Sequence, residues 1–491
     1  MKFYSTRGGE AVSAAQAIVR GISPSGGLYV PETFQQIPAC DYLGAPTYLA
    51  TAQNILQPYL ADTDGSALSA MLQEAYASFD TDEVTPLKQL TANESVLELW
   101  HGPTMAFKDV ALQLLPRLLT NALTVTGERD KVYILVATSG DTGKAALAGF
   151  CGVPGTRVLV FYPYGGVSEM QRLQMVTQEG DNVDVCAVHG NFDDAQTAVK
   201  GVFTDAAIAS SLHAAGWRLS SANSINFGRL LPQIVYYFRA YAKLVESGRI
   251  LAGEAINFCV PTGNFGDILA GEYARRMGLP VRRLLCASNR NNVLADFFRT
   301  GIYAAKRPFY KGMSCSIDIL ISSNLERLLF ELAGRDDARV KEWMQSLREE
   351  GGFAIEESML SELRQVFVGG YCTEEDTLQT IRRTYEAHGY LMDPHTAVGQ
   401  TVYERYAAET GDTAHTVLLS TANPYKFSTA VLSAFEPAGD DDFINAARLH
   451  ALTNEPVPAP YLGLRQKPER HTDVCALCDM PGRVLAPVAG K

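Results

Sequence analysis

From residue 96 onward, short apolar runs rich in Val, Ile and Leu alternate with longer stretches in which apolar residues recur at helical spacing. The apolar runs predict buried strands at 132–137, 158–161, 183–188, 256–260, 283–287 and 416–419. The amphipathic stretches predict helices at 142–150, 168–178, 193–205, 225–246 and 267–277. Such alternation is typical of parallel sheets with helices on both faces, so we expect an α/β fold.

A chain of 491 residues is too long for one simple core, and changes in this pattern mark its expected parts. The N-terminal region is helix-like with Pro and Gly breaks, a later region has helices with charged faces, and the C-terminal region is rich in proline. We therefore predict an N-terminal cap (1–94), a large domain (95–130 and 222–440, with a mostly helical insertion at 324–390), a small mobile domain (131–221) and a C-terminal surface extension (441–491).

Composition and charge narrow the class of protein. A net charge of −12 argues against nucleic acid or an anionic membrane as the main partner. The sequence has no apolar run of bilayer length and no hydrophobic secretory segment near Met1, so we expect a cytoplasmic protein. The nine cysteines are expected to be reduced. Cys475 and Cys478 form a C-x-x-C pair near His471, but no further ligand set follows, so we predict no metal site.

Lys108 ends the segment 101–108 (HGPTMAFK), between an extended apolar run (96–100) and a helical pattern (109–119). Strand-to-helix junctions present ligand-contacting groups in α/β proteins. A lysine whose pKa is lowered by its surroundings can form a Schiff base with an aldehyde cofactor. The alternative is a solvated surface charge, as most lysines are.

The segment 261–267 (PTGNFGD) joins a predicted strand to a predicted helix. Gly263 and Gly266 permit a backbone whose N–H groups point into one hollow, and the helix start adds partial positive charge. This loop suits a phosphate, although it matches neither nucleotide-binding template. The alternative is a tight turn with a glycine at each bend.

The segment 137–143 (ATSGDTG) also ends a strand and opens a helix. The hydroxyls of Thr138, Ser139 and Thr142, with nearby backbone amides, could bind a carboxylate. Asp141 could instead be a simple N-cap of the helix. Capping and ligand binding are compatible, and both interpretations stay open.

A second anion site is predicted in 221–229 (SANSINFGR), ahead of a long apolar helix. Asn223 and Ser224 can donate hydrogen bonds, and the Arg229 guanidinium can bind phosphate in a bidentate way. The alternative is an Asn or Ser cap followed by a surface arginine.

Two further segments complete the candidate site. In 419–427 (LSTANPYKF), the hydroxyl of Ser420 or Thr421 could meet a heteroaromatic nitrogen, although the segment could simply be a strand exit ended by Pro424. In 393–399 (DPHTAVG), His395 is either structural or lines a cleft. All these loops follow predicted strands, where open α/β sheets bind ligands, so together they describe one site.

With these motifs in this order, the chain resembles threonine synthases, pyridoxal-phosphate enzymes of fold type II that are related to the tryptophan synthase β subunit. Further matching segments are 4–8 (YSTRG), 192–196 (FDDAQ) and 322–330 (SSNLERLLF). The chain departs from the family at Asn423 and Tyr425, where His-Pro-Ala is common, at 314–318 (SCSID), where Ser-Pro-Ser-Met-Asp is common, and in its terminal C-x-x-C pair.

The resemblance implies large and small parallel-sheet domains with an N-terminal helical cap, and it implies a role for each candidate residue. Lys108 holds pyridoxal 5'-phosphate as a Schiff base, and Thr421 faces its ring nitrogen. The cofactor phosphate lies on the loop and helix start formed by Gly263, Asn264, Phe265, Gly266 and Asp267. Ser139, Asp141 and Thr142 lie beside the substrate carboxylate and the cofactor's ring hydroxyl, and Asn223, Ser224 and Arg229 hold the substrate phosphate, helped by the charge of Arg172 or Lys426.

The reaction implied by the resemblance is conversion of O-phospho-L-homoserine and water to L-threonine and phosphate, the last step of threonine biosynthesis. The implied enzyme is a carbon–oxygen lyase that acts on phosphates, a monomer or homodimer, with no metal. Two alternatives stay open: a related phospho-lyase that releases 2-oxobutyrate, and a non-catalytic binding module on the same scaffold. The intact motif around Lys108 weighs against the second.

Overall fold

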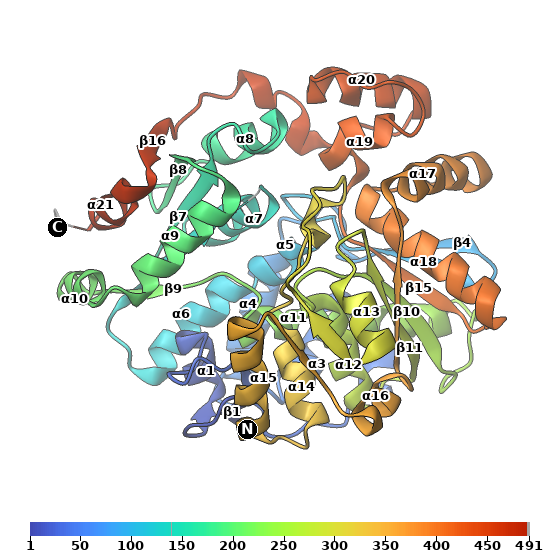
Figure 1. Cartoon of the computed structure of the whole chain (residues 1–491), viewed down its shortest axis with the longest axis horizontal. Coiled ribbons are helices and arrows are strands. Elements are labelled where there is room, and N and C mark those ends of the chain that lie inside the picture. The colour runs from blue at the N-terminus through green and yellow to red at the C-terminus, as the bar shows by residue number, and fades with distance from the viewer. Residues whose placement is uncertain (139, 489–491) are drawn as a thin grey trace.

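A larger, mostly parallel sheet and a smaller, fully parallel sheet form the framework of the computed structural model, which describes residues 1–138 and 140–488 (Figure 1). Among these residues the larger sheet has six strands in the order β14-β11-β10-β15-β5-β4, in which β4 runs antiparallel to β5 and the other pairs are parallel. Its strands are β4 (Leu87–Thr91), β5 (Glu94–Glu98), β10 (Ile256–Pro261), β11 (Val281–Ser288), β14 (Phe367–Tyr371) and β15 (Thr416–Ser420).

The smaller sheet, within the same described ranges, has five parallel strands in the order β16-β8-β7-β6-β9. They are β6 (Lys131–Ala137), β7 (Thr156–Pro163), β8 (Val183–His189), β9 (Trp217–Ser220) and β16 (Asp473–Ala476). Between β6 and β9 along the chain lie the helices α7 (Asp141–Phe150), α8 (Glu169–Val176), α9 (Phe192–Thr204) and α10 (Ala206–Ala214). The six strands and five helices predicted from the alternation are all confirmed, with boundaries that differ by up to two residues.

Helices cover both faces of the larger sheet. On β10, Phe258 packs against Tyr237 of α11 (Phe227–Glu246), with ring centroids 4.8 Å apart. The thiol of Cys259, the next residue, donates to the Gly399 carbonyl of α18 (Pro394–Thr410) over 3.2 Å. Because consecutive strand residues point to opposite faces, α11 and α18 lie on opposite sides. Helix α12 (Gly266–Arg276) packs beside α11.

Several elements differ from the expectations. The N-terminal region has the expected helices, α1 (Ala14–Arg20), α2 (Ala39–Leu43), α3 (Tyr48–Leu56) and α4 (Gly65–Tyr76), but it also has a small antiparallel sheet of β1 (Lys2–Ser5), β2 (Val12–Ser13) and β3 (Tyr29–Pro31). The region is therefore mostly helical, as expected, with a small sheet that the sequence did not indicate. The helix expected over 109–119 is two helices, α5 (Lys108–Leu112) and α6 (Leu115–Thr126), because the second begins around Pro116, a residue suited to a first turn.

The region 324–390 contains the expected helices, α14 (Leu325–Leu332), α15 (Asp337–Glu349), α16 (Glu357–Leu363) and α17 (Glu374–His388), and follows α13 (Val293–Thr300). It is not only helical, because β13 (Gly352–Ala354) pairs with β12 (Ile302–Ala304), and β14 forms the edge of the larger sheet.

The C-terminal segment crosses from the larger sheet to the smaller one. Figure 1 shows it in orange and red, from α19 (Ser428–Leu432) and α20 (Asp442–Thr453) across to β16 and α21 (Met480–Leu485). It does more than cover the surface, because β16 pairs with β8 and extends the smaller sheet. The domain boundaries and the mobility of 131–221 stay predictions. Over the two described ranges, no helix combines the length and hydropathy that a bilayer crossing requires.

Candidate active site

Lys108 lies at the carboxyl edge of the larger sheet, where the chain between β5 and α5 runs beside the segment that follows β15. The Phe107 N–H donates to the Thr421 carbonyl over 2.8 Å, and Ala106 and Ala422 form a β-bridge. This pairing brings buried Thr421 next to Lys108, the first residue of α5. Burial lowers the pKa of the Lys108 amine from its ordinary value, although Asp141 opposes the shift. The interpretation of Lys108 as a solvated surface lysine is therefore wrong.

The carboxylate of Asp141 lies between two lysines. Its Oδ2 is 3.5 Å from Lys108 Nζ, and its Oδ1 is 3.2 Å from Lys426 Nζ. The hydroxyl of Ser316 donates to Oδ2 over 3.1 Å, and the Gln171 amide donates to Oδ1 over 3.3 Å. Burial alone would raise the pKa of Asp141, but Lys426 and Lys108 outweigh it and hold this pKa well below its usual value.

Asp141 does not cap the helix that it opens. Gly140 occupies the N-cap position of α7, and the buried Thr138 hydroxyl accepts hydrogen bonds from the N–H groups of Gly140 and Gly143, each over 3.0 Å. Thr138 therefore shapes the turn, and the simple N-cap interpretation of Asp141 is wrong. Thr142 follows Asp141 and is half-buried. Ser139, predicted to contact the substrate carboxylate, lies outside the described residues.

A hydrogen-bond chain that the motifs did not predict lies beside Lys108 and runs through Ser316, His395 and Asp393. His395, buried at the start of α18, accepts from the Ser316 N–H at Nε2 over 3.0 Å, and its Nδ1 is 2.7 Å from Asp393 Oδ1. Although Asp393 favours a protonated ring, the bond from Ser316 needs a free lone pair on Nε2, so the geometry assigns neutral His395 with its proton on Nδ1. Ser316 also lies 3.3 Å from Lys108 Nζ. The sequence contains one indication of Ser316: it lies in the 314–318 segment, which matches a related motif in the family that the chain resembles.

The loop after β10 forms a backbone cradle. None of the described residues accepts a hydrogen bond from the N–H groups of Gly263, Asn264 or Phe265. Phe265 has a positive φ of 66°, and a Cβ on Gly263 would lie 2.6 Å from the Ser316 carbonyl oxygen, so only glycine fits there. Gly266 begins α12, which adds the partial positive charge of a helix start.

Asp267 faces away from this cradle. Its carboxylate accepts hydrogen bonds from the hydroxyls of Tyr236 and Tyr237 on α11. Burial raises the pKa of Asp267 to about 6, although the two tyrosines lower it. Its side chain therefore anchors α12, and only its backbone remains near the loop.

Arg229 in the first turn of α11 is a buried cation with 6% exposure. It donates to the Ala222 carbonyl over 2.5 Å, and no carboxylate within the described ranges lies within 4.0 Å of it. Burial lowers its pKa to about 10. Ser224 is half-buried and Asn223 is exposed on the loop before this helix. A buried guanidinium without a counter-ion favours an anionic ligand.

Arg327 and Asn324, which contact the loop before Arg229, were not identified from the sequence. The fully buried guanidinium of Arg327 donates to the carbonyls of Tyr29 and Ile225, and Asn324 Nδ2 donates to Ser224 Oγ over 3.0 Å. Together they fix the loop that leads to Arg229. A surface arginine and a buried one look alike in a sequence, so only the surrounding 322–330 motif indicated them.

Two charges expected near the substrate phosphate lie elsewhere or are already paired. Arg172 on α8 pairs with Glu169 over 2.9 Å and with Glu469 of the C-terminal segment over 2.7 Å. It fastens that segment to the smaller sheet, and its assignment to the phosphate is wrong. Lys426 pairs with Asp141. Within the described ranges, no cluster of three or more His, Cys, Asp or Glu side chains is placed to hold a metal ion.

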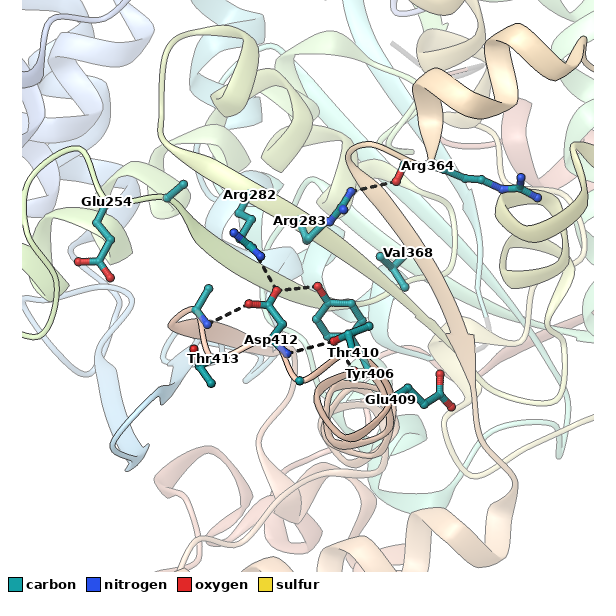
Figure 2. Close-up of a pocket in the computed structure, with 13 residues that line it drawn as sticks. Glu254, Arg282, Arg283, Arg364, Val368, Tyr406, Glu409, Thr410, Asp412 and Thr413 are labelled. Carbon is teal, nitrogen blue, oxygen red and sulfur yellow. Dashed lines mark hydrogen bonds and ion pairs between the residues drawn. The ribbon is translucent and has the colours of Figure 1, made fainter.

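A hollow of about 790 Å³ lies at the opposite, amino edge of the larger sheet (Figure 2). Arg282 and Arg283 at the start of β11 line it, but Arg282 pairs with Asp412, and Arg283 donates to the carbonyls of Arg364 and Gln365. Glu254 and Glu409 also line it. Its positive charges are thus already matched. Among the described residues that line it, none is a lysine and none carries a buried charge without a partner.

Three family models match the chain: one for the threonine synthase N terminus at residues 2–76, one for pyridoxal-phosphate dependent enzymes at 83–361 and one for the threonine synthase C-terminal region at 396–479. Threonine synthase from Pseudomonas aeruginosa is 42% identical over 441 residues, which are 88% of this chain and 90% of that protein. The crystal structure of pyridoxal-phosphate-bound threonine synthase from Brucella melitensis is similar with a TM-score of 0.88 at 40% identity, covering 99% of this chain and 98% of that one. Human threonine synthase-like 1 is 40% identical over 86% of this chain, which spans 58% of the length of the human protein.

Proposed function

Because the chain belongs to the threonine synthase family of pyridoxal-phosphate-dependent enzymes, we propose that it converts O-phospho-L-homoserine and water to L-threonine and phosphate. The main support is one combination: a buried amine at Lys108, a backbone cradle that suits one phosphate, and an unpaired buried guanidinium at Arg229 that suits a second. A substrate with both an amino-acid head and a phosphate uses all three.

The residues present fit pyridoxal phosphate. The free N–H groups of Gly263, Asn264 and Phe265, with the start of α12, would hold its phosphate. Glycine is needed at 263 because a Cβ there would clash with the Ser316 carbonyl. Lys108 would form the Schiff base, Thr421 would face the ring nitrogen, and Asp141 would lie beside the ring hydroxyl. When bound, the cofactor supplies a sink for the negative charge that develops at Cα of the substrate.

Lys108 has the properties of the general base. Burial lowers the pKa of its amine, so a larger fraction is neutral near pH 7 and can take the proton from Cα. The Asp141 carboxylate and the Ser316 hydroxyl hold Nζ from one side, at 3.5 and 3.3 Å, and limit where it can move the proton next. The same amine can then serve Cβ, where water adds.

Arg229 would hold the phosphate that departs from Cγ, together with Asn223 and Ser224. Its guanidinium can bind two phosphate oxygens at once, and it has little competition because the described residues offer it no carboxylate. Thr142, in the first turn of α7, would hold the substrate carboxylate together with Ser139. The backbone N–H groups in the first turn of α7 lie where the helix dipole favours an anion.

The test is to incubate the protein with pyridoxal phosphate and O-phospho-L-homoserine and to measure phosphate and threonine from the same sample. Equal amounts of the two support the proposal. Arg229→Ala should lower kcat/KM by about 10²-fold or more, since a buried charge-assisted contact is worth several kcal/mol, and Arg229→Lys should recover part of it. Arg239→Ala is the matched control, because Arg239 is a buried arginine on the same helix that bonds to Ala45 and Glu246.

A related lyase that releases 2-oxobutyrate is distinguished by the same assay. Phosphate release with 2-oxobutyrate in place of threonine would establish that activity. Unchanged turnover in Arg229→Ala would contradict the assigned phosphate site and with it the proposed substrate.

A further inference from the structure

Lys426 is a second buried lysine in the candidate active site, at 4% exposure. It lies in a short 3-10 helix, Pro424–Phe427, directly after β15. Its Nζ donates to the Thr104 carbonyl over 3.0 Å and lies 3.2 Å from Asp141 Oδ1. Both partners are in place without any ligand, so Lys426 has no need of a phosphate to satisfy its charge.

We infer that Lys426 is a positioning residue for Lys108: it is the permanent counter-ion of Asp141, and it lets Lys108 lose its own charge without leaving that carboxylate unpaired. The inference rests on the proposed function only in taking Lys108 as the amine that reacts with the pyridoxal phosphate aldehyde. It replaces the role in binding the substrate phosphate that the charge of Lys426 had indicated.

The two carboxylate oxygens of Asp141 have different partners. Oδ1 accepts Lys426 and the Gln171 amide, and Oδ2 accepts the Ser316 hydroxyl and faces Lys108. One side of the carboxylate is thus held by groups that do not react, and the other side faces the amine that does. Asp141 stays bound and oriented whatever the charge on Lys108.

Charge balance shows why this second lysine is needed. A buried carboxylate that loses its only cation is costly, because the low-dielectric interior cannot replace the lost attraction. If Lys108 were the only partner of Asp141, each loss of the proton or charge on Lys108 would incur that cost. With Lys426 fixed at 3.2 Å, Asp141 stays compensated.

The pair also spans the two sheets. Asp141 opens a helix on the smaller sheet, while Lys426 and its acceptor Thr104 follow strands of the larger one. The ion pair therefore sets how α7 lies against Lys108, and with it the helix start expected to hold the substrate carboxylate.

The groups that face Lys108 act on its pKa in opposite directions. Burial lowers this pKa, Asp141 and Cys315 raise it, and Arg229 and Lys426 lower it. Removing Lys426 should therefore raise the pKa of Lys108, and neutralising Asp141 should lower it. Removing both should leave it near the native value. A purely structural role for Lys426 predicts no such opposition of signs.

The experiment follows the capture of pyridoxal phosphate by protein from which it has been removed, as growth of the visible absorption band between pH 7 and 9. Only the neutral amine forms the imine, so one unit of pKa corresponds to about tenfold in rate. We expect Lys426→Met to slow capture about tenfold, Asp141→Asn to accelerate it about tenfold, and the double variant to return within about threefold of the native rate. Lys426→Arg keeps the charge and should recover most of the native rate.

Lys144→Met is the matched control, because Lys144 lies on α7, the helix that Asp141 opens, but donates to the neutral Gln178 side chain over 2.6 Å. The rate at which Lys144→Met captures pyridoxal phosphate should stay within about twofold of the native rate. A native rate in Lys426→Met, or a double variant no faster than Lys426→Met, overturns the inference. If Lys426→Met does not fold, a folded double variant with native capture supports the inference, and an unfolded one overturns it. If the capture rates of Lys426→Met and Asp141→Asn change in opposite directions but the native protein forms no threonine, the role of Lys426 is supported and the proposed function is refuted.

Discussion

The two edges of the larger sheet both gather charged side chains, yet they differ in burial and in charge balance. At the carboxyl edge, Lys108, Lys426 and Arg229 are all buried, and the only carboxylate paired with any of them among the described residues is Asp141. At the amino edge, Arg282 is 54% exposed and has its own carboxylate in Asp412 (Figure 2).

This difference shows which property identifies a ligand site. The amino edge has a hollow of about 790 Å³, but its charges are satisfied by the protein and by water. The carboxyl edge holds a surplus of buried positive charge, which costs stability unless an anion offsets it. Uncompensated buried charge, more than cavity volume, therefore points to a substrate that carries phosphate.

The largest expected effect comes from removing the amine at the carboxyl edge. Lys108→Ala should lower threonine formation by at least about 10³-fold, because both the covalent anchor and the general base are lost. Borohydride reduction of the native protein with pyridoxal phosphate, followed by peptide mass spectrometry, should place the pyridoxyl group on Lys108. An adduct at another lysine, or an active Lys108→Ala variant, would remove the basis for assigning the reaction to this edge.

Much of the fold was predictable because buried parallel strands are nearly continuous apolar runs. All six residues of β10 are buried, and its sequence, INFCVP, could be interpreted without any partner. The strand β14 was missed because its sequence, FVGGY, has the glycines typical of a turn. Those glycines are needed for packing: a Cβ on Gly369 would lie 2.7 Å from the Ala295 backbone, and one on Gly370 would lie 2.6 Å from Val402.

The candidate site was predictable to the extent that its groups follow strands in recognisable motifs. The chain around Lys108, the 261–267 loop and the 221–229 segment could all be read in this way. The partners of Asp141 could not, because Ser316 lies 175 residues away in the sequence and Lys426 farther still. Pairing between side chains on different sheets depends on how the sheets meet, which local pattern does not determine.

The second prediction concerns anion binding without turnover. Inorganic phosphate should stabilise the native protein, by about 2.7 kcal/mol at a hundredfold excess over Kd, because it binds the folded state at the surplus positive charge. Arg229→Ala should lose most of this stabilisation, and Arg282→Ala should keep it. Thermal unfolding across a phosphate series at constant ionic strength measures it. Equal responses of the two variants would erase the distinction between the two edges.

The third prediction uses the carboxylate of the amino edge. Burial would raise the pKa of Asp412, but hydrogen bonds from Tyr406, Ala414 and Asn257 and the charge of Arg282 lower it to about 2. Because the folded pKa is below the unfolded one, Asp412 stabilises the fold above about pH 4, and this contribution is lost as the pH falls toward 2. Asp412→Asn should cost about 1–3 kcal/mol at pH 7.

Urea unfolding of the native protein and of Asp412→Asn at several pH values tests this. The difference between them should shrink as the pH falls from 4 to 2, while kcat and KM at pH 7 stay unchanged. A difference that is constant with pH would mean that Asp412 acts through packing or neutral hydrogen bonds and not through its charge.

The smallest effect is expected from Arg282→Ala, and it bears on the comparison most directly. Arg282 is more than half exposed, so its ion pair with Asp412 is screened by water and should contribute at most about 1 kcal/mol. Its loss should leave threonine formation within about twofold of the native rate, because Arg282 lies at the start of β11, at the opposite edge of the sheet from Lys108. Steady-state kinetics of Arg282→Ala tests this, with Arg282→Lys as the charge-preserving control. A tenfold change in KM for Arg282→Ala but not for Arg282→Lys would mean that the hollow binds a charged ligand and that this binding is coupled to catalysis. Charge balance would then no longer distinguish the amino edge from the carboxyl edge.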